Sequence, residues 1–234
     1  MIKKLLIVAV SAGMLALVSI GAAVAIGGPE LKAGFSDGHF EWDSDDYHGP
    51  VATRSFDFDM TKPLEIAMPI DMTFERGETI SMTVEGPKKT IDRLVYEDGE
   101  LKVPGSHEGV GGGIKVKITA PVLPALDIAG PANIEITDLR QPEFRLSMAG
   151  AGNVEASGKV DSLTVDASGA GNIDLASLEA GDADVSLAGL GNADINASGK
   201  VEAAIAGAGN VTLHRKPREL DSSIAGLGNV EHDY

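Results

Sequence analysis

The 234-residue chain contains no cysteine, and aromatic residues make up only 4% of it. The lack of cysteine excludes disulfide bonds, zinc–thiolate sites, thiol catalysis and a lipid-modified cysteine after a leader. The scarcity of aromatics argues against a core anchored by Phe and Trp. Gly contributes 29 residues and 43% of the chain is hydrophobic. Such a mixture of small and aliphatic residues suits thin, closely stacked layers.

Basic residues are also few, since 19 Lys and Arg stand against 35 Asp and Glu, giving a formal net charge of −16. A surface this acidic repels phosphate backbones and anionic headgroups, so we expect no nucleic-acid partner. The five histidines are scattered along the chain and form neither a metal-ligand pair nor a catalytic triad. We therefore predict that the protein is not an enzyme and binds no cofactor.

The N-terminus has the pattern of an export signal. Lys3 and Lys4 precede a long apolar run, and Ala23-Val24-Ala25 matches an A-x-A cleavage site. The alternative is a retained membrane anchor, because residues 5–26 are uncharged and long enough to span a bilayer. We predict that residues 1–25 are a signal peptide or an anchor. Both place the remainder in the periplasm or at the cell surface of a bacterium.

The mature chain divides into a linker and one domain over residues 51–234. Residues 26–50 form an acidic linker, rich in Gly, Pro, Ser and Asp, without lasting periodicity. Residues 51–125 contain short runs of period two, such as SFDFDM and IKVKITAP, which predict strands that cap the N-terminal end of the domain. Residues 107–113, HEGVGGG, precede no helix and are not a phosphate loop.

Residues 126–234 repeat a Gly-x-Gly-Asn motif, with Gly-Pro-Ala-Asn in the first copy. Its asparagines recur every 18 to 20 residues, at Asn133, Asn153, Asn172, Asn192, Asn210 and Asn229. Apolar residues alternate on both sides of each Asn, so one face of each strand points inward. We predict a right-handed parallel β-helix, a solenoid of about six coils with Gly-x-Gly-Asn corners. Stacked asparagine amides would form a structural ladder of hydrogen bonds.

A column of acidic residues lies two positions after the asparagines, interrupted only by Thr212. This acidic column consists of Glu135, Glu155, Asp174, Asp194 and Glu231. Strand alternation points these side chains outward, where stacked like charges repel by a few tenths of a kcal/mol per pair. Solvent alone accommodates them, or cations or a basic partner neutralise them. The basic run HRKPREL (214–220) is either a salt-bridging loop or a contact for an acidic partner.

Four segments together resemble a known family. They are PIDMTFERGETISMTVEG (69–86), DGELKV (98–103), IKVKITAPVLPALDIAG (114–130) and the Gly-x-Gly-Asn repeats. In this order they resemble the putative auto-transporter adhesin head GIN domain family, a bacterial exported domain of unknown function. The resemblance covers residues 51–234 and implies a β-helical repeat in an envelope or exported protein. It supplies no catalytic residues.

Our expectation is a non-enzymatic, exported cell-envelope protein. It would be an adhesin-like module that binds an envelope or surface ligand, protein or glycan, along the outer faces of a rigid β-helix. The alternative is a structural scaffold that associates end to end with another copy. A polysaccharide-processing enzyme is a third, less favoured reading. Membrane contact is expected only through an uncleaved N-terminal segment.

Overall fold

The computed structural model describes residues 50–105 and 113–234. The predicted leader, nearly all of the predicted linker and most of the 107–113 loop lie outside the described residues. The described residues form one sheet of twelve strands and a short helix, α2 (Lys88–Ile91). In chain order the strands are β1 (Val51–Phe56), β2 (Leu64–Ile66), β3 (Ile70–Arg76), β4 (Ser81–Pro87), β5 (Val95–Glu97), β6 (Glu100–Lys102), β7 (Lys115–Ala120), β8 (Ala125–Ala129), β9 (Ala132–Ala197), β10 (Lys200–Leu213), β11 (Glu219–Gly226) and β12 (Asn229–His232).

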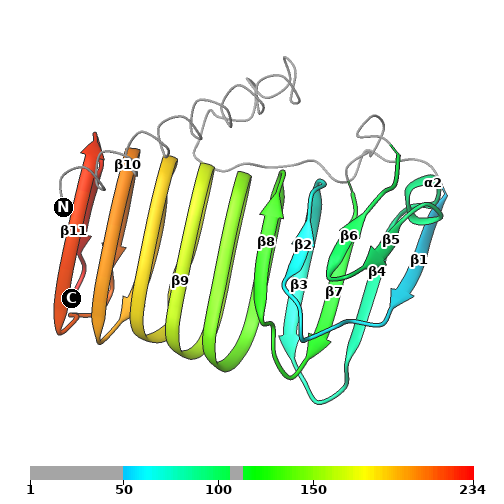
Figure 1. The fold of residues 1–234 in the computed structure, drawn as a ribbon, viewed down its shortest axis with the longest axis horizontal. Coiled ribbons are helices and arrows are strands. Elements are labelled where there is room, and N and C mark those ends of the chain that lie inside the picture. Colours follow the sequence, from blue (N-terminus) through cyan, green and yellow to red (C-terminus); the bar gives the residue numbers. More distant parts are fainter. Residues whose placement is uncertain (1–49, 106–112) are drawn as a thin grey trace.

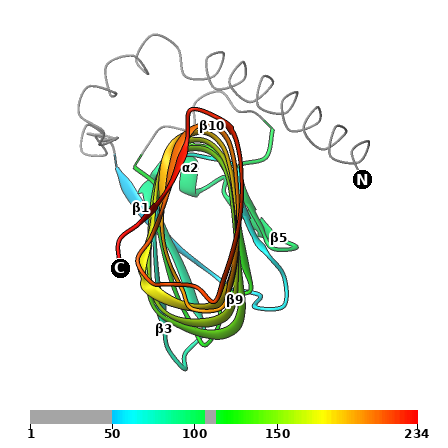
Figure 2. The same cartoon turned by 90° about the vertical axis from the view of Figure 1, so that its left-hand side faces the viewer.

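Two walls of strands face each other across the core (Figure 2). Strand segments before each Gly-x-Gly-Asn corner form the first wall, and segments after it form the second. β9 covers 66 residues because it passes through several corners without leaving the sheet. β10 pairs in parallel with β9, and β12 pairs in parallel with β10. Each repeat is therefore one coil of chain around both walls, and the coils stack along the molecule (Figure 1).

The predicted right-handed parallel β-helix is wrong, although the described residues are all-β apart from α2. The sheet is mixed, because β4 runs antiparallel to β1 and β7, and β5 runs antiparallel to β6. The strands also do not stack in chain order: β3 lies between β7 and β9, and β2 lies between β6 and β8. After β3 the chain builds β4 to β7 on one side and returns at β8 on the other. The result is a nearly closed barrel with parallel and antiparallel strands, in which only the repeats after β8 wind coil by coil.

A coil that precedes the repeat in sequence stacks in the repeat's register. Leu64 of β2 pairs with Leu126 of β8, and Asp71 of β3 pairs with Asn133 of β9. The letters LEIA (64–67) match LDIA (126–129), but Met-Pro-Ile-Asp stands where the repeat has Gly-Pro-Ala-Asn. Residues 64–76 thus form a divergent coil with Asp in the asparagine position.

The corners pack backbone against backbone, which explains their glycines. Gly169 has φ +151°, and a Cβ added there would lie 1.9 Å from the carbonyl oxygen of Gly150 in the neighbouring coil. Side chains of other residues cannot occupy such a space, and their backbones rarely adopt this conformation. The glycine column therefore sets how closely the coils stack.

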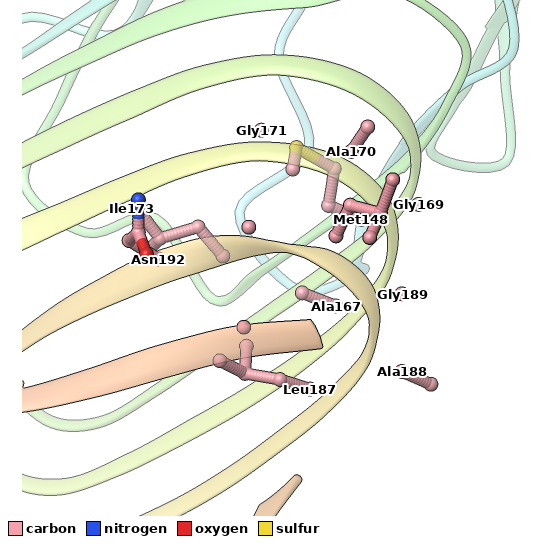
Figure 3. A pocket seen from close by; sticks show the side chains of 13 residues that line it. Met148, Ala167, Gly169, Ala170, Gly171, Ile173, Leu187, Ala188, Gly189 and Asn192 are labelled. Atoms are coloured by element: carbon pink, nitrogen blue, oxygen red, sulfur yellow. The ribbon is translucent and has the colours of Figure 1, made fainter. Parts of the chain in front are cut away.

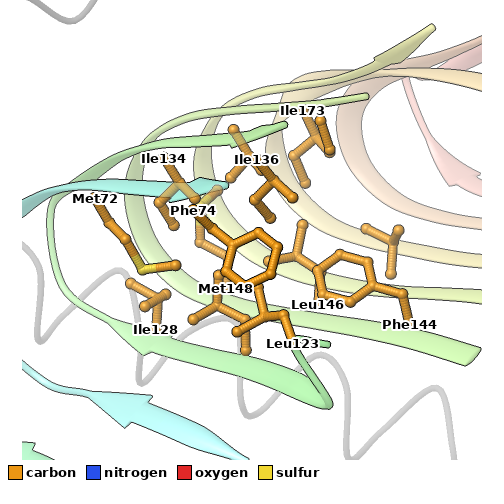
Figure 4. Close-up of a cluster of buried hydrophobic side chains, with 14 of the residues drawn as sticks. Met72, Phe74, Leu123, Ile128, Ile134, Ile136, Phe144, Leu146, Met148 and Ile173 are labelled. Carbon is orange, nitrogen blue, oxygen red and sulfur yellow. The ribbon is translucent and has the colours of Figure 1, made fainter. Parts of the chain in front are cut away.

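The core fills the space between the walls and changes in size along it. Near β3 it contains large side chains that are at most 3% exposed, including Met72, Phe74, Phe144 and Met148 (Figure 4). Further along, alanines such as Ala193 occupy the equivalent inward positions. Buried and exposed residues alternate along strands such as β7 and the first part of β10, as the period of two requires. Among the described residues, no helix is long and apolar enough to cross a bilayer.

Candidate functional site

The asparagine column lies on the second wall, immediately after the corners. Asn153 Nδ2 donates to Asn133 Oδ1 at 3.4 Å, and Asn192 Nδ2 donates to Asn172 Oδ1 at 3.1 Å. These side-chain amides bridge neighbouring coils. In these two pairs the amides bond to each other across neighbouring coils, so both pairs contribute to coil stacking.

The column continues at both ends beyond these bonds. Asn133 Nδ2 donates to Asp71 Oδ1 at 3.0 Å, so a carboxylate heads the row of amides. At the other end Asn210 stands opposite both Asn192 and Asn229 in the strand register. Asp71 was not among the residues predicted from the sequence, although the match between LEIA and LDIA could have revealed it.

The acidic column runs beside the asparagines on the outer face of the second wall. At one end of the column, Glu135 lies opposite Thr73 in the neighbouring strand. At the other end, Thr212 lies between Asp194 and Glu231. Glu135, Glu155, Asp174 and Glu231 are exposed, while Asp194 is half-buried. In the described parts of the chain, no three His, Cys, Asp or Glu side chains are grouped so that they could hold a metal ion.

Members of the acidic column differ in how far other groups engage them. Asp174 Oδ1 accepts a hydrogen bond from the backbone N–H of Ala176 at 3.1 Å. Asp194 Oδ1 lies 2.8 Å from His214 Nε2. Within residues 50–105 and 113–234, four acids of the column form no ion pair: Glu135, Glu155, Asp174 and Glu231. They are the members best placed to meet a basic partner.

A second group of acids stacks on the first wall. Glu202 lies opposite Asp184 on one side and Asp221 on the other. We call Asp184, Glu202 and Asp221 the first-wall stack. Burial raises the pKa of Asp184, and the negative charges of Glu202 and Asp166 raise it further. The first-wall stack was not predicted from the sequence, because the columns there were aligned around the asparagines.

The basic run at 214–220 folds partly onto neighbouring acids. His214 contacts Asp194 and Asp233, and Arg218 Nη2 lies 4.0 Å from Asp182 Oδ1. The backbone N–H of Arg218 also donates to Gly199 O at 2.8 Å. These contacts agree with the salt-bridging interpretation of the run. Arg215 and Lys216 remain exposed.

A shallow hollow lies at the corners of three coils (Figure 3). Its empty volume is about 310 Å³, part of which is open solvent. Met148, Leu187 and Ile173 line it together with corner glycines and alanines, and Asn192 supplies a polar group. The lining contains no carboxylate, histidine or hydroxyl, so the hollow has no general acid, base or nucleophile.

These features define an all-β domain with an acidic outer face and no catalytic cluster in the hollow. The chain belongs to the family described as "Putative auto-transporter adhesin, head GIN domain", whose model matches residues 62–217. This confirms the family resemblance inferred from the sequence.

Solved structures resemble this chain at low sequence identity. A putative adhesin from Bacteroides fragilis is 19% identical, with a TM-score of 0.61 over 78% of this chain and 97% of that chain. A putative adhesin from Parabacteroides distasonis is 16% identical, with a TM-score of 0.47 over 79% of this chain and 98% of that chain. A putative lipid binding protein from the same organism is 20% identical, with a TM-score of 0.38 over 79% and 97%. No curated protein matches the chain.

Proposed function

We propose that the protein is a non-enzymatic, adhesin-like binding module exported to the periplasm or cell surface of a bacterium. In this proposal residues 1–25 direct export or anchor the chain, residues 26–50 act as a linker, and residues 51–234 form the binding domain. The partner is an envelope or surface protein or glycan with basic groups. The observation that carries the proposal is the exposed acidic column along the outer face of the second wall.

The geometry of the acidic column favours many weak contacts over one pocket. Stacked strands place successive side chains about 4.8 Å apart, so the acids follow a straight line on a rigid support. Single exposed ion pairs contribute only about 0.2–1 kcal/mol each. Several contacts to one partner act together, because the first raises the effective concentration for the next. The family membership supports the adhesin-like assignment.

Charge reversal tests which face binds. Glu135→Lys, Glu155→Lys and Glu231→Lys together reverse three of the four acids of the column that form no ion pair. Asp184→Lys, Glu202→Lys and Asp221→Lys reverse the first-wall stack and change the net charge equally. Binding of the fluorescently labelled protein to intact bacterial cells would be measured for both variants. We expect the first variant to lose at least about tenfold in affinity and the second to change little. Equal losses, or none in the first variant, would contradict the proposal.

The non-enzymatic part of the proposal is supported by the composition of the hollow and by the exposed, scattered acids. A glycan panel incubated with the protein and analysed by mass spectrometry tests it. We expect no cleavage products. Catalytic turnover of any glycan would replace this assignment with a polysaccharide-processing enzyme.

A second candidate function is a self-associating scaffold, and Ile224 is the observation that favours it. Ile224 of β11 is 44% exposed, whereas its neighbour Ile205 in the preceding coil is 2% exposed. Within the described residues β11 and β12 each pair with β10 alone, so backbone groups at this edge are available to another strand. Stacking of a second copy there would bury both features.

Sedimentation velocity over a concentration series separates this candidate from the first. Ile224→Lys places a charge on the edge, whereas Leu190→Lys alters a residue that is 61% exposed at a corner away from it. A scaffold would sediment faster with rising concentration, and only Ile224→Lys would abolish that dependence. A wild-type sedimentation coefficient independent of concentration would eliminate the scaffold.

A further inference from the structure

His214 connects three successive coils near the last strands of the chain. Its Nε2 lies 2.8 Å from Asp194 Oδ1 on β9, and its Nδ1 lies 3.3 Å from Asp233 Oδ2, just after β12. Backbone hydrogen bonds fix both flanks: His214 N–H donates to Ile195 O at 2.8 Å, and Asp233 N–H donates to Leu213 O at 2.9 Å. The imidazole is thus placed between two carboxylates from different coils.

An ionised carboxylate can only accept hydrogen bonds. Both Asp194 and Asp233 therefore need a donor from the His214 ring. A neutral imidazole carries one N–H and can donate to one of them, leaving a lone pair directed at the other. An imidazolium carries two N–H groups and can donate to both. We infer that His214 is a pH-sensitive clamp, which fastens β12 to the rest of the sheet when its ring is protonated.

The surroundings of His214 favour this assignment. From β9 the group facing it is Asp194, with Asp174 the next acid along the acidic column. From β12 and its extension the facing groups are Asp233 and, on the adjoining rung, Glu231. Within its own loop, Arg215 and Lys216 are exposed. The contacting groups are therefore acidic on both sides, and both can accept a hydrogen bond from the ring.

The clamp acts on the coil with the least support. Within the described residues β12 pairs only with β10, and Asn229, Glu231 and His232 of this strand are exposed. Local opening is easiest where few apolar contacts and few backbone bonds must break. This coil carries Glu231 of the acidic column, so the clamp would control one part of the proposed binding face. Opening of β12 depends on His214 whether or not a ligand is bound.

Amide hydrogen exchange at about pH 5 and about pH 8 tests the clamp, because histidine side chains change charge across this range. Protection factors for the amides of β12, corrected for intrinsic exchange, would be referred to those of β10 in the same molecule. We expect about fivefold higher protection at the lower pH, the equivalent of about 1 kcal/mol from the additional charged hydrogen bond. His214→Gln should show equal protection at both pH values, matching the wild type at the higher one.

His232→Gln is the matched control, because His232 lies on β12 itself and contacts Tyr234 rather than the two carboxylates. This variant should retain the pH dependence. A second readout needs no substitution: long-range ¹H–¹⁵N spectra of the wild type should show both ring nitrogens of His214 protonated at the lower pH. The inference is overturned by pH-independent protection in the wild type, by pH dependence that persists in His214→Gln, or by its loss in His232→Gln.

Discussion

The strands near the N-terminal end and the coils that follow them are stabilised in different ways. Around β3 the core contains Phe74, Met72 and Phe144, all at most 1% exposed. The later coils bury alanines such as Ala193 and Ala203 in the same inward columns. Large side chains gain more from burial, so hydrophobic stabilisation is concentrated at the N-terminal end. The later coils depend more on backbone pairing, corner glycines and side-chain amides.

The edges of the sheet differ as well. On edge strand β1, the Arg54 side chain donates to Leu94 O, and its guanidinium carbon lies 4.8 Å from the centre of the Phe56 ring. A charged side chain directed across an edge discourages another strand from pairing there. On edge strand β11, Ile224 is exposed beside the charged residues Glu219 and Asp221. One end of the sheet therefore has a core of large side chains, whereas the other has smaller core side chains and an edge strand that exposes Ile224 among charged and polar residues.

The largest expected loss of stability comes from removing a large core side chain near β3. Phe74→Ala should lower the free energy of unfolding by about 4 kcal/mol, because it removes a buried ring and leaves a cavity. Ile224→Ala in the last coil should lower it by about 1 kcal/mol or less, since this side chain is already partly solvated. Urea denaturation followed by circular dichroism measures both. Similar losses for the two variants would mean that stabilisation is spread evenly along the stack.

The next largest effect distinguishes a repeat corner from a turn among the N-terminal strands. Gly169→Ala should destabilise the protein by about 3 kcal/mol. The new Cβ would clash with the Gly150 carbonyl oxygen, and alanine would be strained at this positive φ. Gly105 has φ +90°, but a Cβ there would meet nothing within 4 Å. Gly105→Ala should therefore cost about 1 kcal/mol from backbone strain alone. Thermal and urea unfolding would compare them, and equal losses would contradict close stacking at the corners.

The same comparison explains how much could be predicted from sequence. In the repeat, the asparagine spacing and the alternation of apolar residues predicted which residues align between coils. Asn210 indeed lies opposite Asn192, and Asn229 opposite Asn210. The family was also recognisable from its segments. Such predictions succeed where each coil pairs with the next coil along the chain. The repeat length then determines which residues lie opposite each other.

The failures arose where pairing is not local. No period in residues 64–120 reveals that β3 lies between β7 and β9, since strands separated by dozens of residues pair there. The antiparallel direction of β4 is likewise set by packing, and the predicted parallel β-helix failed on this point. In the candidate site, the outward acidic column was predictable from alternation. The bridge from His214 to Asp194 and Asp233 was not, because it depends on a side-chain direction at the end of a strand.

A third prediction concerns the contact between the divergent coil and the repeat. Asp71→Leu should lower stability by about 1.5 kcal/mol, because the Asn133 amide then loses its acceptor. Asp71→Asn restores an acceptor oxygen and should cost less than about 0.5 kcal/mol. Urea unfolding measures the difference, and the Asn133 side-chain amide resonance reports the bond directly. Equal losses in the two variants would show that the loss comes from the missing charge rather than from the unpaired amide.

The smallest expected effect lies in the first-wall stack and changes with pH. Burial and the adjacent acids raise the pKa of Asp184, so the folded protein holds this proton more tightly than the unfolded chain does. The contribution of the protonated Asp184 carboxyl to the free energy of unfolding is therefore present at low pH. It is lost as the pH rises through the pKa of this group in the folded protein. Asp184→Asn removes the repulsion, and it should raise stability at pH 7 by about a few tenths of a kcal/mol.

At about pH 3.5 the wild-type carboxyl already holds much of its proton, so the gain from Asp184→Asn should shrink there. Asp161→Asn removes an exposed acid outside the stack and provides the control at both pH values. Urea midpoints of the three proteins measure the differences. A gain of the same size at both pH values would mean that it comes from a different strand propensity of Asn and Asp rather than from charge repulsion. A gain that disappears on acidification would show that the small-residue coils stack despite charge repulsion between them, so that their backbone pairing and corner packing must outweigh it.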